Sequence, residues 1–155
     1  VDRARDELVV DRRRRRDLRL AREEHGREIQ IWGNAYVVQR ATQKEAEDYL
    51  KRYVVELGDD PAVENILNIQ GQQMQRLLPE AREAIKFSIK AGWGGVPLVG
   101  TADRIVDDLQ KFTGIGLDDL LLSWVDYIEG LDDWQREVMP RLEQLELRQP
   151  LRANA

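Results

Sequence analysis

The sequence has no cysteine and a single histidine, His25, among its 155 residues. The absence of cysteine excludes disulfide bonds, thiolate metal ligands and cysteine nucleophiles, and it fits a reducing compartment. His25 has no second histidine with which to share a metal, so we expect no metal site. The motifs Gly-x-Ser-x-Gly and Gly-x-x-x-x-Gly-Lys are also missing, which excludes a serine nucleophile elbow and a phosphate-binding loop.

Long apolar runs are missing as well. The longest is far shorter than the roughly 20 residues that cross a bilayer, and the first residues, Val-Asp-Arg-Ala-Arg-Asp-Glu, are too charged for a signal peptide. The formal net charge of −5 gives no electrostatic reason for binding nucleic acid or an anionic membrane. Because 42% of the residues are hydrophobic, the chain can bury a core. We expect a cytoplasmic protein with no nucleic-acid or membrane partner.

Residues 2–27 form a highly charged segment that includes five consecutive arginines, Arg12 to Arg16. An anion-binding patch is one interpretation. We favour a solvated helix, because acidic residues flank the arginines and the apolar stripe is thin. His25 and Gly26 mark its end, where the helix dipole favours a cation.

The chain is organised around a strand–helix–strand unit in its second half. An apolar strand is predicted at 96–100, Thr101 is a good N-cap, and apolar residues at helical spacing predict a helix over 102–113. Gly114 can end that helix in the left-handed conformation. The almost unbroken apolar run that follows predicts a buried parallel strand at 118–124. Such a βαβ unit is typical of an α/β fold.

Another strand is predicted at 29–38, with Gly33 and Asn34 in its middle. A glycine inside a strand often marks a close approach of another segment, and the polar Asn34 among apolar neighbours needs a partner. The capping box of Thr42 to Glu45 then opens a helix over 43–57.

Residues 58–95 are interpreted as a helical insertion ahead of the strand at 96–100. Asp60 as N-cap, followed by proline, predicts a helix over 61–77, and a further helix is predicted over 80–91. An insertion at the ligand-facing end of a barrel is usually a lid or a specificity element. Gly92 to Gly95 would be its hinge, with an enclosed tryptophan that belongs either to the lid or to the core.

A last helix is predicted over 131–145, with Pro140 kinking or restarting it. Residues 149–155 have the composition of a frayed tail. For Trp32 and Trp134 we favour core packing.

Three motifs occur in order: Gly-Val-Pro-Leu-Val-Gly-Thr-Ala-Asp-Arg-Ile-Val-Asp-Asp-Leu, Gly-Ile-Gly-Leu-Asp-Asp-Leu-Leu-Leu-Ser-Trp and Glu-Val-Met-Pro-Arg-Leu. Together they resemble the C-terminal end of the bacterial luciferase-like flavin-dependent monooxygenases. The strand that ends Tyr-Val-Val-Gln-Arg-Ala-Thr-Gln-Lys-Glu-Ala-Glu is similar to the family's preceding strand with its Arg-x-Thr-x-x-Glu-Ala turn. The chain looks most like the two-component branch of alkanesulfonate, dimethylsulfone and pyrimidine monooxygenases.

The resemblance implies the C-terminal portion of a (β/α)8 TIM barrel with an inserted helical segment. A complete barrel needs about 250 residues, so the chain would be a single partial domain with the last three or so strands, inactive as a fragment alone. The implied partners are the remainder of the barrel, a second copy in a homo-oligomer, and a separate flavin reductase that supplies reduced FMN.

In this family reduced FMN and dioxygen oxidise a small organic substrate, and the protein supplies no acid or nucleophile of its own. Two alternatives remain open. One is a deazaflavin-dependent oxidoreductase of the same superfamily, and the other is a non-catalytic half-barrel assembly module.

The resemblance also implies a site. By strand register, Asn34 and Tyr36 would contact the cofactor, in positions where alkanesulfonate enzymes carry an arginine and a histidine. That exchange speaks against sulfonate recognition. Ser123 and Trp124, at the carboxyl end of the last strand, would also contact the cofactor. The implied substrate and lid residues are Lys90, Trp93 and Tyr127.

Overall fold

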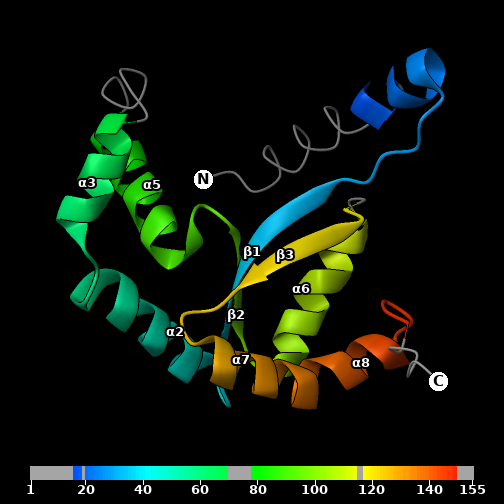
Figure 1. Cartoon of the computed structure of the whole chain (residues 1–155). Coiled ribbons are helices and arrows are strands. Elements are labelled where there is room, and N and C mark those ends of the chain that lie inside the picture. Colours follow the sequence, from blue (N-terminus) through cyan, green and yellow to red (C-terminus); the bar gives the residue numbers. More distant parts are fainter. Residues whose placement is uncertain (1–15, 19, 70–77, 115–116, 150–155) are drawn as a thin grey trace.

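The protein has an α/β fold in which three parallel strands lie between helices (Figure 1). A computed structural model describes residues 16–18, 20–69, 78–114 and 117–149. The strands there are β1 (Trp32–Gln39), β2 (Val96–Gly100) and β3 (Asp119–Ser123). The helices are α2 (Gln43–Lys51), α3 (Asp60–Ile69), α5 (Pro79–Gly92), α6 (Ala102–Gly114), α7 (Tyr127–Asp133) and α8 (Met139–Gln144), with π-helical turns η1 (Arg52–Glu56) and η2 (Trp134–Val138).

The strand order is β2-β1-β3, so β1 is the central strand. β2 pairs with residues 35–39 of β1, and β3 pairs with residues 32–36, both in parallel. The predicted parallel sheet is therefore confirmed. The strand at 96–100 matches its prediction, and the ends of the other two strands lie one to three residues from the predicted ones.

The side chains of β1 enter two different cores, as the period of two in a strand requires. Ala35 and Val37 point to one face, where they pack with Leu98 and with residues of α6, η2 and α8. Tyr36 and Val38 point to the other face, which is covered by α2, η1 and the end of α5. Because both faces are covered here, this half of β1 is continuously apolar.

The helices lie on both faces because the two crossovers run in opposite directions across the sheet. The chain moves from β1 to β2 on one side, and then passes over β1 to reach β3 on the other. Right-handed crossovers in opposite directions put their helices on opposite faces, and Figure 1 shows α2, α3 and α5 across the sheet from α6.

This order differs from that of three consecutive barrel strands, which would be β1-β2-β3 with helices on the outer face alone. The α/β class with parallel strands is confirmed, and the closed barrel stays a prediction.

Two helix starts agree with the sequence. Thr42 and Glu45 form the capping box: Thr42 Oγ1 accepts from the Glu45 N–H at 3.2 Å, and Glu45 Oε2 accepts from the Thr42 N–H at 3.0 Å. Thr101 Oγ1 accepts from the Arg104 N–H at 3.3 Å, as expected of the N-cap of α6. Pro140 lies in the first turn of α8, which continues directly from η2, so the kink or restart stays a prediction.

The prediction of Asp60 as an N-cap is wrong. Asp59 caps α3, since its Oδ1 accepts from the Ala62 N–H at 2.9 Å, whereas Asp60 is the first helical residue. Two adjacent aspartates compete for the cap, and local sequence does not decide between them. The Asp60 carboxylate is thereby left for a contact with α5.

The predicted start of the last helix at residue 131 is also wrong. Asp126 Oδ1 accepts from the N–H groups of Ile128 and Glu129, at 2.9 and 3.2 Å, so the helix begins at Tyr127. An N-cap aspartate outweighs the glycine that follows at position 130.

Trp134 is buried as predicted, but Trp32 is 51% exposed and the core prediction for it is wrong. The helices on its side cover only the carboxyl half of β1. Asn34 is exposed on the same side, so it needs no partner inside the protein. Gly33 does mark a close approach, because an added Cβ would lie 2.9 Å from Leu120.

Several predictions fall outside the described residues: most of the arginine run, residues 70–77 of the third helix, and the tail from residue 150. In the charged segment, residues 16–18 and 20–25 are helical and the helix ends at His25, as predicted. Within the described ranges, no helix is both long enough and apolar enough to cross a membrane.

Thr101→Ala should lower the free energy of unfolding by about 1 kcal/mol, because α6 would lose its side-chain acceptor. Urea denaturation followed by circular dichroism measures this loss. Thr101→Ser keeps the hydroxyl and is the matched control. Equal losses in the two variants would contradict the capping role.

Candidate functional site

The topology points to the gap between the carboxyl ends of β1 and β3. These strands are neighbours, yet the chain leaves β1 toward α2 on one face and leaves β3 toward η2 and α8 on the other. Open parallel sheets bind ligands at such a switch point, outside the carboxyl ends of the strands.

A cavity of about 320 Å³ lies at this position. Its walls come from the carboxyl half of β1, from η1, from the end of α5 and from the residues that follow β3. Six of the seven residues predicted for the site line it: Tyr36, Lys90, Trp93, Ser123, Trp124 and Tyr127. We call it the switch-point cavity.

Asn34 does not line the switch-point cavity. It lies two residues before Tyr36 on the same face of β1, beside Leu121 of β3, and is exposed. The structure therefore brings the other predicted residues together and leaves Asn34 outside them.

Backbone contacts position the walls. A Cβ added to Gly92 would lie 2.4 Å from Tyr36 Cβ, so glycine lets the end of α5 approach this ring. Ser123 Oγ donates a hydrogen bond to the carbonyl oxygen of Ala35 at 3.2 Å, which ties β3 to β1. The Tyr53 hydroxyl donates to the carbonyl oxygen of Ala91 at 2.9 Å, which ties η1 to α5.

Trp124 connects the cavity to the core. Its ring meets Tyr127 and Trp134 edge-on, with ring centroids 5.7 Å apart in both pairs. Such contacts add to apolar burial. Since Trp134 is buried against α6 and the sheet, the wall formed by Trp124 is held from behind.

Trp93 ends α5 in the left-handed conformation, with φ of 54°. Its N–H donates to the carbonyl oxygen of Ile89, and the Gly94 N–H donates to that of Ser88, both at 3.0 Å, a pattern typical of a helix C-cap. The ring is 71% exposed, so the alternative that Trp93 packs in the core is wrong. Movement of this segment as a hinge stays a prediction.

Burial raises the pKa of the Tyr36 hydroxyl, and burial together with the nearby Tyr36 and Tyr49 raises the pKa of Tyr53. Both phenols are therefore neutral across the physiological range. Each offers a hydrogen-bonding group to the cavity region without adding charge.

A much smaller cavity, of about 20 Å³, lies beside the switch-point cavity and shares Trp124 as a wall. Gln39 Nε2 donates to Glu137 at 3.1 Å, which fixes the amide orientation because a carboxylate only accepts. Gln39 Oε1 and Trp124 Nε1 are both buried with no hydrogen-bond partner within the described part of the chain. Both residues are among those that line this small cavity.

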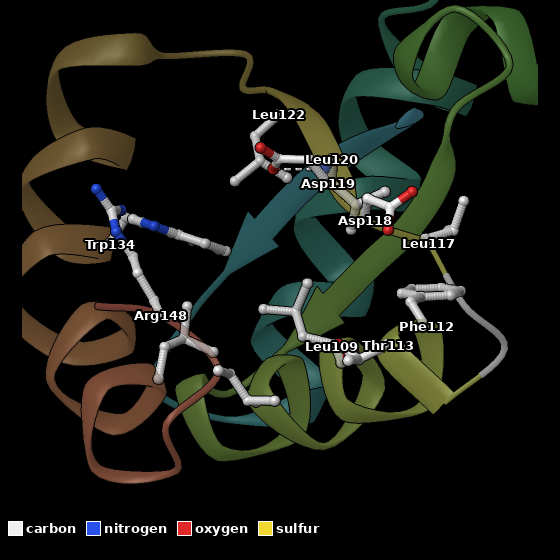
Figure 2. Close-up of a pocket in the computed structure, with 12 residues that line it drawn as sticks. Leu109, Phe112, Thr113, Leu117, Asp118, Asp119, Leu120, Leu122, Trp134 and Arg148 are labelled. Carbon is white, nitrogen blue, oxygen red and sulfur yellow. Dashed lines mark hydrogen bonds between the residues drawn. The ribbon is translucent and has the colours of Figure 1, made fainter. Parts of the chain in front are cut away.

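A larger cavity, of about 460 Å³, lies between the amino end of β3 and helices α6 and α8 (Figure 2). Most of its wall is apolar, and its aspartates bond the backbone: Asp118 accepts from the Ile31 N–H and Asp119 from the Leu120 N–H, both at 2.7 Å. It lies at the end of the sheet opposite the switch point. We therefore take the switch-point cavity as the candidate site.

No protein-family model matches the chain. The chain is 25% identical to the sulfoquinovose monooxygenase of Novosphingobium aromaticivorans over 140 residues, which take in 81% of this chain and 39% of that protein. This similarity points to the luciferase-like monooxygenases. It does not distinguish a branch of the family, and the chain spans less than half the length of the relative.

Sequence reasoning missed two residues of the site region. Tyr53 looked like one of several packing residues on its helix, and Asp60 looked like a cap. Their roles depend on how η1 and α3 pack against α5, which no local pattern encodes. Among the described residues, no three histidine or acidic side chains are grouped so that they could hold a metal ion.

Gly92→Ala should destabilise the protein by about 1 to 3 kcal/mol, because the added Cβ would overlap with Tyr36. Gly94→Ala is the matched control: its Cβ would meet only Ser88 Oγ at 4.0 Å, and its φ of 77° costs about 1 kcal/mol. Thermal and urea unfolding measure both. A smaller loss for Gly92 than for Gly94 would contradict the close approach.

Stability should fall as the pH rises above the ordinary tyrosine pKa of 10.0, because Tyr36 and Tyr53 hold their protons in the folded state and release them in the unfolded state. Tyr53→Phe should cost about 1 kcal/mol at about pH 8, where its hydrogen bond to Ala91 is lost. The variant should then lose less than the original protein between about pH 8 and about pH 11. Urea denaturation gives the free energy of unfolding at each pH. An equal loss of this free energy with pH in the variant and the original protein would contradict the assigned pKa directions.

Proposed function

We propose that the chain is the C-terminal part of a luciferase-like flavin-dependent monooxygenase. Reduced FMN, delivered by a separate reductase, and dioxygen would oxidise a small organic substrate, as in the two-component branch of the family. The observation that carries the proposal is the meeting of Tyr36, Ser123 and Trp124 with Lys90, Trp93 and Tyr127 around one cavity at a switch point. The similarity to a monooxygenase supports it independently.

The walls of the switch-point cavity fit a flavin ring better than its phosphate. Aromatic side chains suit a planar heterocycle, and the volume is at the lower end of the range for ligand pockets, about 300 to 1,000 Å³. Lys90 is already bound to Asp60 at 2.7 Å, so this wall has no unpaired cation for a phosphate. Under the proposal the remainder of the barrel binds the phosphate.

The flavin, when bound, supplies the electrons and activates dioxygen. The residues of this chain orient and enclose: Trp124 forms a wall backed by Trp134, and Ser123 is fixed by its bond to Ala35. Trp93, at the end of the inserted helices, would close over the substrate and keep water out. In the longer protein, strands that this chain does not contain would complete the barrel. That protein would form a homo-oligomer.

Flavin titration tests the proposal. The longer protein that contains this chain should bind FMN and consume dioxygen when reduced FMN and substrate are supplied, and Trp124→Leu should weaken FMN binding at least about tenfold, equivalent to 1.4 kcal/mol. Phe112→Leu, in the wall of the larger cavity, is the matched control and should leave binding unchanged. Preference for a deazaflavin would favour the related oxidoreductases. Binding of neither cofactor would favour a non-catalytic assembly module.

A further inference from the structure

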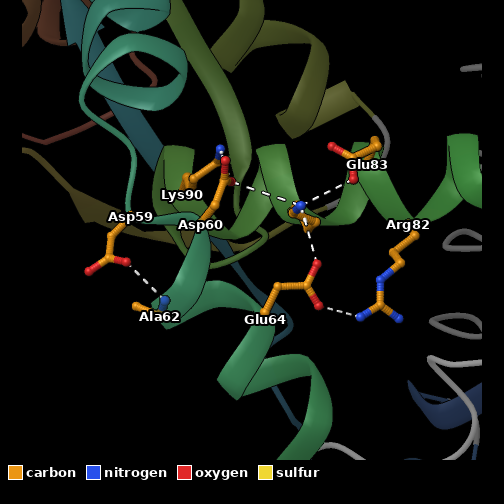
Figure 3. Close-up of polar contacts among 8 residues, drawn as sticks. Asp59, Asp60, Ala62, Glu64, Arg82, Glu83 and Lys90 are labelled. Atoms are coloured by element: carbon orange, nitrogen blue, oxygen red, sulfur yellow. Dashed lines mark hydrogen bonds and ion pairs between the residues drawn. The ribbon is translucent and has the colours of Figure 1, made fainter.

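Helices α3 and α5 carry opposite charges on their facing sides (Figure 3). Arg82, Lys86 and Lys90 recur at every fourth residue of α5, opposite Asp60 and Glu64 of α3. Glu64 binds Arg82 and Lys86, the latter at 3.2 Å, and Asp60 binds Lys90 at 2.7 Å. The two helices are antiparallel, so later residues of α5 pair with earlier residues of α3. The last pair joins Asp60 to Lys90, which lines the switch-point cavity.

Lys90 is the only cationic side chain among the described residues that line the switch-point cavity. Its side chain is 14% exposed, whereas that of Asp60 is 58% exposed. The hydrogen bond from Lys90 lowers the pKa of the Asp60 carboxyl, so this group is ionised at neutral pH. Asp60 does not itself line the cavity, but its carboxylate offsets the charge of the Lys90 ammonium, which belongs to the wall.

Aromatic residues form a large part of the rest of the wall. Five of the residues that line the cavity are aromatic: Tyr36, Tyr53, Trp93, Trp124 and Tyr127. The Tyr36 hydroxyl has no hydrogen-bond partner within the described residues, and burial raises its pKa, so it remains a neutral donor. Such a wall suits a flat ring that carries a neutral acceptor.

We propose that Asp60 is a specificity-determining residue: by holding Lys90 it keeps the α5 side of the cavity neutral, so that the site takes an uncharged aromatic substrate beside the flavin and rejects an anionic one. The inference rests on the proposed function, whose substrate class it names. It sets this chain apart from a relative whose name refers to sulfoquinovose, a sulfonated sugar.

The physical reason is competition for Lys90. An anion in the cavity gains the ammonium only if Lys90 gives up Asp60, and it then faces a carboxylate of the same sign that keeps only its longer contact with Lys86, at 4.0 Å. Specificity of this kind comes from repulsion as much as from attraction. A neutral ring meets neither cost, because the Lys90 pair with Asp60 can stay intact.

The test compares two ligands of nearly the same shape: methyl phenyl sulfone, which is neutral, and benzenesulfonate, which is an anion. Quenching of tryptophan fluorescence reports binding by the full chain, since Trp93 and Trp124 line the cavity. The variants are Asp60→Asn, the double variant with Lys90→Met, and Glu64→Gln. The last removes an acid one turn further along α3 that binds Arg82 and Lys86, whereas Lys90, the cation of the cavity wall, pairs with Asp60.

The original chain should bind the sulfone more tightly than the sulfonate. Asp60→Asn should strengthen sulfonate binding at least about fivefold, leave the sulfone unchanged, and lose this gain in high salt. Adding Lys90→Met should abolish the gain, and Glu64→Gln should not produce one. A chain that already prefers the sulfonate, an equal effect of Asp60→Asn on both ligands, or no binding of either ligand would overturn the proposal.

The flavin titration of the longer protein separates this inference from the function on which it rests. FMN binding and turnover with no change in charge selectivity in Asp60→Asn would reject the role of Asp60 alone. Charge selectivity that follows Asp60, in a protein that binds no flavin, would reject the monooxygenase and keep the neutral cavity.

Discussion

The position of β1 between two parallel neighbours is the constraint on which the rest of the structure depends. Successive side chains of a strand point to opposite faces, so Tyr36 and Val37 must enter different cores. Helices therefore have to cover both faces of the carboxyl half of β1. The chain meets this requirement by leaving β1 and β3 in opposite directions, and the cavity lies where these two paths diverge.

Much of the fold could be predicted because its signals are local. The capping box at Thr42 and the cap at Thr101 each depend on a few neighbouring residues, and both are confirmed. Strand order is not local. It depends on which edge of β1 receives each later strand, and the apolar pattern of β3 is the same on either side. The prediction that Trp32 packs in the core was wrong for a related reason. An aromatic residue in a strand is buried only if another element covers that face of the sheet.

The site was predictable to the extent that it depends on strand ends. The carboxyl ends of parallel strands meet at one edge of a sheet, which puts Tyr36 and Ser123 at the same edge. Their direct pairing depends on β1 and β3 being neighbours. The contribution of α5 depends on how the end of this helix docks on β1. Gly92 allows the docking because a Cβ at this position would overlap with Tyr36. Asp60 could not be identified from sequence, since its contact with Lys90 is made across two antiparallel helices.

The uncovered part of the sheet bears on the proposed barrel. Trp32, Asn34 and Leu121 lie on the face that carries Tyr36, toward the amino ends of β1 and β3, and Trp32 and Leu121 are 51% and 57% exposed. In a closed barrel the inner face carries no helices. Here α2, η1 and the end of α5 cover the carboxyl half of this face, so only its amino half is open to further strands. Exposed tryptophan and leucine on one face of a sheet are expected where another segment packs on that face. The switch-point cavity would then be one side of a deeper site, whose neutral aromatic wall this chain provides.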